Sequence, residues 1–192
     1  MKNPCKTKWQ KKWLDLDVVS PAIQELATEA ESFCGKWMDN NVEKSLLIIV
    51  GNYGSGKTHT AKRIFKFCMA ASMNAYDSGK WGRYRVPTSV FIPWPEATTA
   101  FANKEFGLVG DALDADLTIL DDVGAENDPW KVSTDRLCQI LSRRETKFTV
   151  LTTNVASAHW NEKFDGRIND RLFRNSVIVD LTDVPSYAQT HF

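Results

Sequence analysis

The sequence predicts an α/β fold built on a doubly wound parallel sheet of about five strands. Five short apolar runs of strand length alternate with segments of helical periodicity, which is typical of parallel sheets with helices on both faces. A glycine-rich segment joins the first run to a helix, as expected at the ligand-binding edge of such a sheet. With 192 residues and 43% hydrophobic residues, the chain can bury one sizeable core.

The chain divides into a basic arm, residues 1–19, and a single domain, residues 20–192. Residues 1–13 contain five lysines and no acid, although the whole chain has a net charge of +0. Lysines interleaved with Trp9 and Trp13 can bind a phosphate backbone and stack on bases, can dock on an acidic partner, or can form a solvated terminus. All three interpretations stay open.

Composition excludes several classes of protein. No apolar run has the length of a membrane span, and the N-terminus lacks the apolar segment of a secretion signal. The four cysteines form no C-x-x-C pair, which argues against zinc and redox motifs. Three of them, Cys34, Cys68 and Cys138, lie among apolar residues at helical spacing, which predicts reduced core cysteines in a cytoplasmic protein without a membrane partner.

A helix is predicted over residues 21–40, directly before the first strand. Ser20 can cap its N-terminus, and Pro21 suits the first helical position. Its apolar residues recur at helical spacing, so we expect this stripe to pack on the sheet. Because the helix leads into the strand before the glycine-rich loop, it can also wall a base pocket.

The remaining elements follow in alternation. Strands are predicted at residues 45–50, 89–92, 117–120, 148–152 and 177–179, and helices at residues 59–73, 95–103, 133–144, 157–163 and 166–173. The helix over 59–73 should turn Ile64, Phe65, Cys68 and Met69 to one face, and the short strand at 89–92 should be buried. Segments 76–87 and 107–110 carry glycines and are predicted to be connections.

The glycine-rich segment, residues 51–58, reads GNYGSGKT and matches G-x-x-x-x-G-K-[ST], the phosphate-binding P-loop. Loop N–H groups at a helix N-terminus bind anions, the lysine reaches the β- and γ-phosphates, and the hydroxyl binds Mg²⁺. The sequence therefore predicts ATP and Mg²⁺ as cofactors. The predicted nucleotide contacts are Gly51, Asn52, Tyr53, Gly54, Ser55, Gly56, Lys57, Thr58 and His59.

Two more strand ends carry polar groups to the same edge of the sheet. The strand over 117–120 ends in Asp121 and Asp122, a Walker-B pattern in which the first acid holds Mg²⁺ beside Thr58 and the second orients the attacking water. Many related ATPases have Glu at the second position, so we expect slow or partner-stimulated hydrolysis. Thr-Thr-Asn follows the next strand, and Asn154 is the predicted contact to the γ-phosphate or the water.

Three arginines at helical spacing follow, Arg167, Arg171 and Arg174. An arginine supplied to a neighbouring subunit's γ-phosphate stabilises transition-state charge. The alternative is a solvated or acid-paired helix face.

A second basic and aromatic cluster lies in the segment 76–87. Its candidate single-stranded DNA contacts are Lys80, Trp81, Arg83, Tyr84 and Arg85. An ordinary surface loop with its aromatic rings packed on the body is an equally good interpretation.

Together these motifs resemble the AAA+ ATPases of the DnaC-type replicative helicase loaders and the IstB-like transposition ATPases. The carrying segments are GNYGSGKTHTAKRIF, LTILDDVGAE with Asp128-Pro-Trp130, Arg144 before the strand at 148, TTN, and GRINDR. The resemblance implies an AAA+ core, Arg171 as the trans-acting arginine with Arg167 as its rival, self-assembly driven by ATP, contact with single-stranded DNA, and docking on a helicase.

Two features depart from that pattern. Family members often have an arginine after a Ser-Tyr pair near the C-terminus, where this chain has Ala188 after Tyr187. We also expect no separate lid domain. The function predicted from the sequence is that of an ATPase that loads or remodels a replicative helicase. The alternatives are an IstB-like accessory ATPase, a small-molecule P-loop kinase, and an ATP-bound adaptor with slow turnover.

Overall fold

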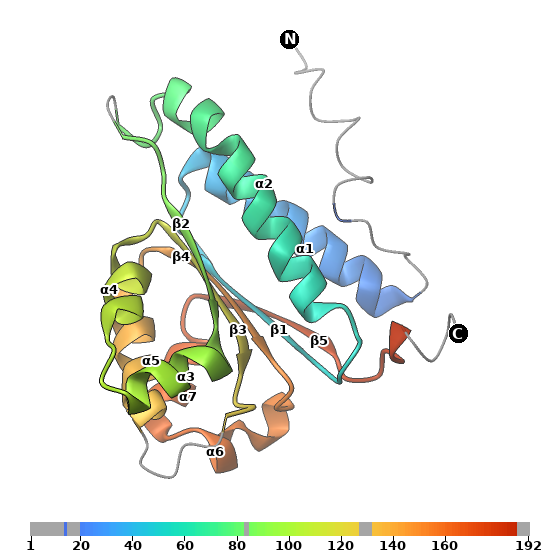
Figure 1. The fold of residues 1–192 in the computed structure, drawn as a ribbon. Helices are drawn as coiled ribbons and strands as arrows, with labels where there is room; N and C mark the ends of the chain where they lie inside the picture. Colours follow the sequence, from blue (N-terminus) through green and yellow to red (C-terminus); the bar gives the residue numbers. More distant parts are fainter. Residues whose placement is uncertain (1–13, 15–19, 83–84, 127–131, 188–192) are drawn as a thin grey trace.

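Five strands form one parallel sheet in the order β2-β3-β4-β1-β5 (Figure 1). The computed structural model describes residues 14, 20–82, 85–126 and 132–187. The doubly wound sheet predicted from the sequence is confirmed. The strands are β1 (Leu46–Gly51), β2 (Ser89–Pro93), β3 (Leu117–Val123), β4 (Phe148–Thr153) and β5 (Ser176–Leu181).

Helices cover both faces of the sheet, with α1 and α2 on one face and the remaining helices on the other (Figure 1). The first face carries α1 (Pro21–Asp39) and α2 (Lys57–Asp77). The second carries α3 (Trp94–Ala102), α4 (Gly107–Asp114), α5 (Val132–Arg143), the 3₁₀ turn η1 (Ser157–His159), α6 (Trp160–Lys163) and α7 (Gly166–Phe173).

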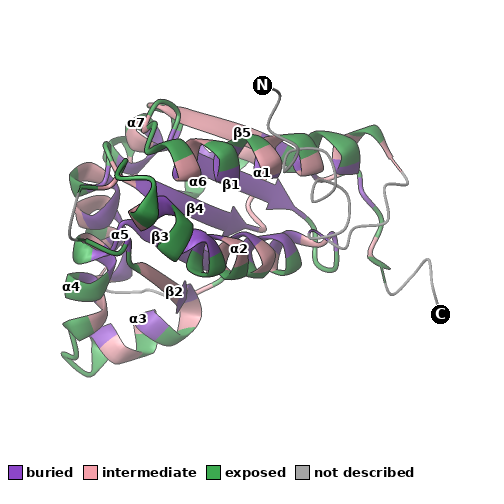
Figure 2. Cartoon of the chain, turned by 90° about the horizontal axis from the view of Figure 1, so that it is seen from above, coloured by how far each residue is buried: buried purple, intermediate pink, exposed green. Residues whose placement is uncertain are grey.

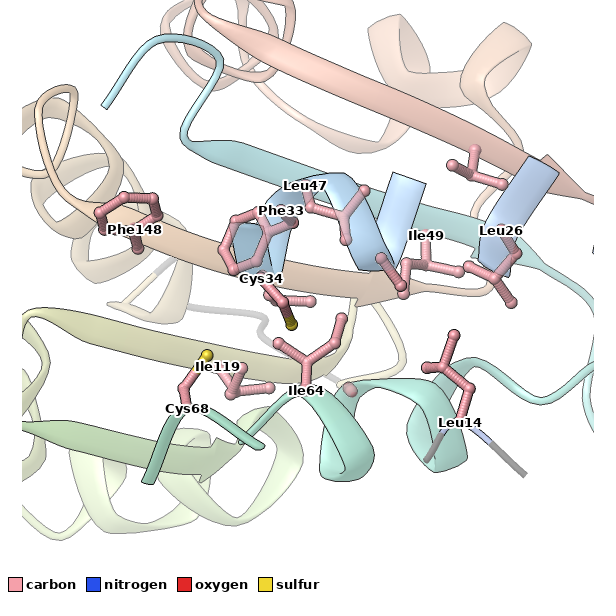
Figure 3. Packing of buried hydrophobic residues seen from close by; sticks show 14 of the residues in the cluster. Leu14, Leu26, Phe33, Cys34, Leu47, Ile49, Ile64, Cys68, Ile119 and Phe148 are labelled. Carbon is pink, nitrogen blue, oxygen red and sulfur yellow. The ribbon is translucent and has the colours of Figure 1, made fainter. Parts of the chain in front are cut away.

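The predicted cap and apolar stripe of α1 are confirmed. The Ile23 N–H donates to the Ser20 hydroxyl at 3.3 Å, and α1 buries Leu26, Phe33 and Trp37. These side chains pack with Leu47 and the other strand residues that face α1 and α2 (Figure 3). Because helices cover both faces, every residue of β1 is buried (Figure 2), as expected for the central strands of a parallel sheet.

Three local predictions are wrong. Residues 107–110, predicted as a connection, begin helix α4, which buries Val109 and Ala112 against the core. β2 is an edge strand with only Ile92 buried, whereas the sequence predicted a buried strand. Met69 was predicted to share one face of α2 with Ile64 and Cys68, but it is 54% exposed, whereas Ile64 and Cys68 are buried.

The cysteine prediction is confirmed for two residues. Cys34 and Cys68 are free and buried between α1 and α2 (Figure 3), and burial raises the pKa of the Cys68 thiol. Cys138 is also free but only partly buried. Within the described part of the chain, no helix is both long and apolar enough to cross a membrane.

Candidate nucleotide-binding site

The P-loop connects the end of β1 to the first turn of α2. Gly54 and Gly56 have φ values of +78° and +94°, a region that side chains other than glycine adopt only with strain. Ser55 closes the loop on itself, since its hydroxyl donates to the Asn52 carbonyl oxygen at 2.8 Å. Left-handed glycines directly before a helix N-terminus are typical of loops whose N–H groups bind an anion.

Residues that follow β5 pack against the back of this loop. The Tyr187 N–H donates to the Gly54 carbonyl oxygen at 3.0 Å, and the Asn52 amide donates to the Thr182 carbonyl oxygen at 2.7 Å. A Cβ on Gly54 would lie 2.2 Å from the Ser186 hydroxyl. The Ser-Tyr pair is therefore a support of the P-loop that the motif did not reveal, while Ala188 lies outside the described residues.

Lys57 is a buried cation, with 6% of its surface exposed. Its ammonium donates to the carbonyl oxygens of Gly51, at 2.9 Å, and Asn52, at 2.8 Å. Burial lowers the pKa of the Lys57 ammonium, while the carboxylates of Asp122 and Asp121 oppose that shift. The side chain thus lies between the loop and the two acids, where it can exchange carbonyl oxygens for phosphate oxygens.

Thr58 and Asp121 meet across the two strand ends predicted to hold Mg²⁺. The Thr58 hydroxyl donates to Asp121 Oδ1 at 3.0 Å, and the Asp121 carboxyl is mostly buried. The described residues contain no group of three or more His, Cys, Asp or Glu side chains that could hold a metal ion. A hydroxyl and one carboxylate beside a phosphate site nevertheless suit Mg²⁺, which prefers oxygen ligands and usually keeps water and substrate phosphates in its shell. The residues therefore fit the predicted Mg·ATP.

Asp122 adopts a left-handed conformation, with a φ of +64°. It lies inside β3, where the pairing with β4 shifts register between Leu120 and Val123, and not after the end of the strand as predicted. This conformation costs an L-residue roughly 1–2 kcal/mol, and strain of this kind is common at functional sites. Asn154 Nδ2 donates to Asp122 Oδ1 at 2.5 Å, so the two predicted polar groups lie together.

Thr152 connects both acids and was not singled out from the sequence. Its buried hydroxyl accepts the Asp122 N–H at 2.8 Å and donates to Asp121 Oδ1 at 2.7 Å. The signal available in the sequence was its place in the Thr-Thr-Asn segment, where only Asn154 was chosen. Its two hydrogen bonds depend on the pairing of β3 with β4, which sequence spacing does not specify.

The three arginines do not form one free face. Arg167 pairs with Asp165 and Asp135, at 2.7 and 3.3 Å. Arg171 Nε lies 3.1 Å from Glu145 Oε1, and its side chain is 27% exposed.

Arg171 and Arg174 share an acid on their own helix. Asp170 Oδ2 lies 2.5 Å from Arg171 Nη1 and 2.7 Å from Arg174 Nη2. The arginine predicted to act in trans is therefore held by acids of its own subunit.

Arg144 lies at the other end of the sheet and is buried, with 3% of its surface exposed. Its five N–H groups donate to Thr149 Oγ1 and to the carbonyl oxygens of Ala112, Ala115, Asp116 and Phe148, at 2.6 to 3.2 Å. Burial lowers the pKa of this guanidinium to about 10, and Asp116 partly opposes the shift. Arg144 thereby joins the end of α4 to the start of β4, a structural role.

The basic and aromatic segment is only partly described, because Arg83 and Tyr84 lie outside the described residues. Trp81 packs its ring against Trp37 and Phe148, with centroids 4.7 and 5.9 Å apart. Lys80 pairs with Asp39, and Arg85 lies 2.5 Å from Asp116. The surface-loop interpretation thus accounts for the tryptophan, while the two cations keep about half of their side chains exposed, 48% and 54%.

Two other predicted nucleotide contacts lie at the rim of the loop. Tyr53 is 73% exposed. The His59 ring nitrogen Nε2 lies 3.0 Å from the carbonyl oxygen of Leu14, a residue buried against α1 and α2. The P-loop helix is thus in contact with the segment that precedes α1.

Comparison with solved structures relates the fold to DnaI, a helicase loader and a replication initiator. No protein-family model matches the sequence, and no curated protein matches it. Among solved structures, DnaI has a TM-score of 0.70 and 20% identity over 91% of this chain and 88% of DnaI. The DnaC helicase loader has a TM-score of 0.68 and 18% identity, over 88% of this chain and 98% of that one.

A replication initiator shares the core as well. DnaA bound to AMPPCP and single-stranded DNA has a TM-score of 0.64 and 16% identity over 93% of this chain and 50% of DnaA. The resemblance to DnaC-type loaders is therefore confirmed at the level of the fold. The sheet, the P-loop and the flanking helices have the AAA+ P-loop NTPase fold.

Proposed function

We propose that the chain is an ATP-binding and ATP-hydrolysing AAA+ protein that loads or remodels a replicative DNA helicase on single-stranded DNA. The observation that carries the ATPase proposal is the contact between Thr58 and Asp121, 3.0 Å across two separate motifs. The likeness to the DnaI and DnaC structures supports the choice of a helicase as partner.

Each residue of the site has a proposed role. Lys57 and the loop N–H groups bind the triphosphate, and Thr58 with Asp121 holds Mg²⁺, which would neutralise phosphate charge. Asp122 orients the attacking water, and Asn154 contacts the γ-phosphate or that water. Four tasks of phosphoryl transfer, namely phosphate binding, metal binding, orientation of the water and contact with the γ-phosphate, thus have a candidate side chain at one edge of the sheet.

Arg171 remains the proposed arginine that completes a neighbouring subunit's site, with Arg167 as its rival. Arg171 would have to release Glu145 and Asp170 before it could reach a phosphate. Self-assembly would then be coupled to the breaking of ion pairs within one subunit. An Arg171→Ala variant should lose the concentration dependence of turnover, and unchanged turnover would transfer the role to Arg167 or remove it.

Single-stranded DNA is the proposed nucleic-acid partner, and the segment around Lys80 and Arg85 is one contact. Both side chains are half exposed, and cations of this kind bind phosphates at an affinity that falls with salt. Trp81, which packs against Trp37 and Phe148, would hold the segment on the body of the domain. Loss of single-strand binding in Lys80→Ala/Arg85→Ala, with Trp81 intact, would support this contact; equal binding at low salt would remove it.

One experiment separates the proposed function from its rivals. The purified chain is given Mg·ATP, and the products are analysed for free phosphate or a phosphorylated acceptor. Free phosphate supports the ATPase, while a phosphorylated small molecule would indicate a P-loop kinase. Binding to a purified hexameric helicase, compared with binding to a transposase, then distinguishes a loader from an IstB-like accessory ATPase.

A slow-turnover adaptor is the second candidate, and a specific contact favours it. Asn154 Nδ2 donates to Asp122 Oδ1 at 2.5 Å, so this carboxylate oxygen would have to exchange its partner before it could accept a hydrogen bond from the attacking water. Single-turnover kinetics with and without DNA test this candidate. Tight ATP binding with no release of phosphate under either condition would favour the adaptor.

A further inference from the structure

Thr152 is hydrogen-bonded to both acids of the Walker-B strand. Its hydroxyl accepts the main-chain N–H of Asp122 and donates its proton to Asp121 Oδ1, at 2.8 and 2.7 Å. The residue is fully buried. The same Asp121 oxygen also accepts the Thr58 hydroxyl at 3.0 Å, so a continuous set of hydrogen bonds runs from the P-loop to Asp122.

The conformation of Asp122 needs such a partner. The residue has a φ of +64° at an irregular point of the β3–β4 ladder, where regular backbone pairing is interrupted. A buried N–H without an acceptor costs about 1–3 kcal/mol. The Thr152 hydroxyl replaces the missing strand carbonyl and thereby stabilises a strained conformation.

We propose that Thr152 is a positioning residue for the phosphate chemistry of this site: its hydroxyl holds Asp122 in the left-handed conformation and fixes the carboxylate of Asp121 toward Thr58. The inference rests on the proposed ATPase function. A hydroxyl is required because one atom must accept from one acid's main chain and donate to the other acid's side chain. Thr152 couples the metal-binding acid to the water-orienting acid.

Two substitutions isolate the hydroxyl from the methyl group. Thr152→Val keeps the shape and removes both hydrogen bonds, while Thr152→Ser keeps the hydroxyl. Thr118→Val is the matched control, since Thr118 is also fully buried in the sheet and its hydroxyl donates to the Ala112 carbonyl oxygen at 2.9 Å. That hydroxyl contacts no residue of the site.

Two measurements test the proposal. In Thr152→Val we expect kcat for ATP to fall about 10- to 100-fold, since misplacement by ~1 Å can cost that much, while the KM for ATP changes less than about threefold. Amide hydrogen exchange of the nucleotide-free protein should show loss of protection at Asp122. Thr152→Ser should restore both properties to nearly the wild-type values, and Thr118→Val should leave both unchanged.

The contrary outcomes are distinct. A Thr152→Val protein with wild-type kcat and wild-type protection at Asp122 would overturn the proposal, as would an equal loss in Thr118→Val. If Thr152→Val does not fold, Thr152→Ser becomes the test. The proposal would be overturned if kcat falls in Thr152→Ser and stays at the wild-type value in Thr118→Val. If the wild type hydrolyses no ATP, the proposed function fails, and the exchange at Asp122 still decides whether Thr152 holds this backbone.

Discussion

Lys57 and Arg144 are both buried cations whose hydrogen-bond partners are mainly main-chain carbonyl oxygens, and they lie at opposite ends of the sheet. Arg144 uses each of its five donors on a separate oxygen. Among the described residues, Lys57 donates to two carbonyl oxygens, both in its own loop, and it lies near the two acids of β3. A cation whose donors are all used by the fold has none left for a ligand, whereas one with exchangeable partners can bind phosphate.

Both charges are desolvated, and the two sites differ in the acids that lie near them. Burial lowers the pKa of both side chains, to about 10 for Arg144. The acids near Lys57, Asp121 and Asp122, are residues of the proposed site, whereas Asp116 near Arg144 is itself paired with Arg85. Substitutions at the two ends should therefore affect different properties, namely stability at one end and nucleotide binding at the other.

The largest expected effect is on stability at the Arg144 end. Arg144→Met leaves buried carbonyl oxygens of α4 and β4 without a donor, and we expect a loss of about 3–5 kcal/mol in the free energy of unfolding. Denaturant titration measures it. Arg143→Met is the matched control, because Arg143 is the exposed neighbour on α5 and should change stability by less than about 0.5 kcal/mol. Equal effects of the two substitutions would contradict the structural role of Arg144.

At the Lys57 end, Asp121→Asn should act on the ligand and not on the fold. The substitution removes one charged Mg²⁺ ligand beside Thr58, and we expect affinity for Mg·ATP to fall about 100-fold with little change in the unfolding temperature. Isothermal titration with and without Mg²⁺ measures the loss. Asp111→Asn, on the exposed side of α4, is the control. Unchanged Mg²⁺ dependence in Asp121→Asn would show that the metal is held elsewhere.

Gly54→Ala tests whether the residues that follow β5, Ser186 in particular, support the P-loop. The alanine would carry the strain of a +78° φ and would also meet the Ser186 hydroxyl. Gly79→Ala is the control, since it has a φ of +70° and nothing within 4 Å, and should cost only about 1–2 kcal/mol. We expect Gly54→Ala to cost at least about 1 kcal/mol more by denaturant titration, part of which Ser186→Gly should restore. Equal costs at the two glycines would contradict the contact.

The smallest expected effect concerns the start of α7. Asp165 accepts the N–H groups of Arg167 and Ile168 at 2.9 and 3.0 Å, so Asp165→Ala should cost about 1 kcal/mol. The hydrogen bond from the Arg167 side chain holds the pKa of Asp165 below its ordinary value of 3.8, and the main-chain N–H groups of Ile168 and Arg167 lower it further. A carboxyl with a lowered folded pKa binds its proton more weakly when folded, so its contribution is present above about pH 3.8 and is lost as pH falls through the lower folded value. Asp165→Ser should keep the cap without this pH dependence; identical acid transitions in the wild type and Asp165→Ser would contradict the account.

The sequence predicts the sheet and most of its helices because local signals agree with the fold. It does not predict α4, since Gly107 and Gly110 are poor helix formers, and the helix depends on tertiary contacts: the burial of Val109 and Ala112 and the hydrogen bond from Arg144 to the Ala112 carbonyl oxygen. The P-loop and Asp121 are predicted from their motifs and the strands before them, and the structure brings Thr58 and Asp121 within 3.0 Å of each other. Thr152 and the roles of Arg144 and Ser186 are not predicted, because each depends on a contact between segments at least thirty residues apart or on a strand irregularity.

Binding of Mg·ATP to Lys57→Ala, measured beside Arg144→Met on folded protein, tests the central claim most directly. We expect Lys57→Ala to lose affinity at least about 100-fold, as removal of a desolvated charge partner predicts, while its unfolding temperature stays within a few degrees of the wild type. Arg144→Met should show the reverse, with reduced stability and nearly wild-type affinity. A Lys57→Ala protein that binds Mg·ATP as tightly as the wild type would contradict the claim that this loop is the nucleotide site.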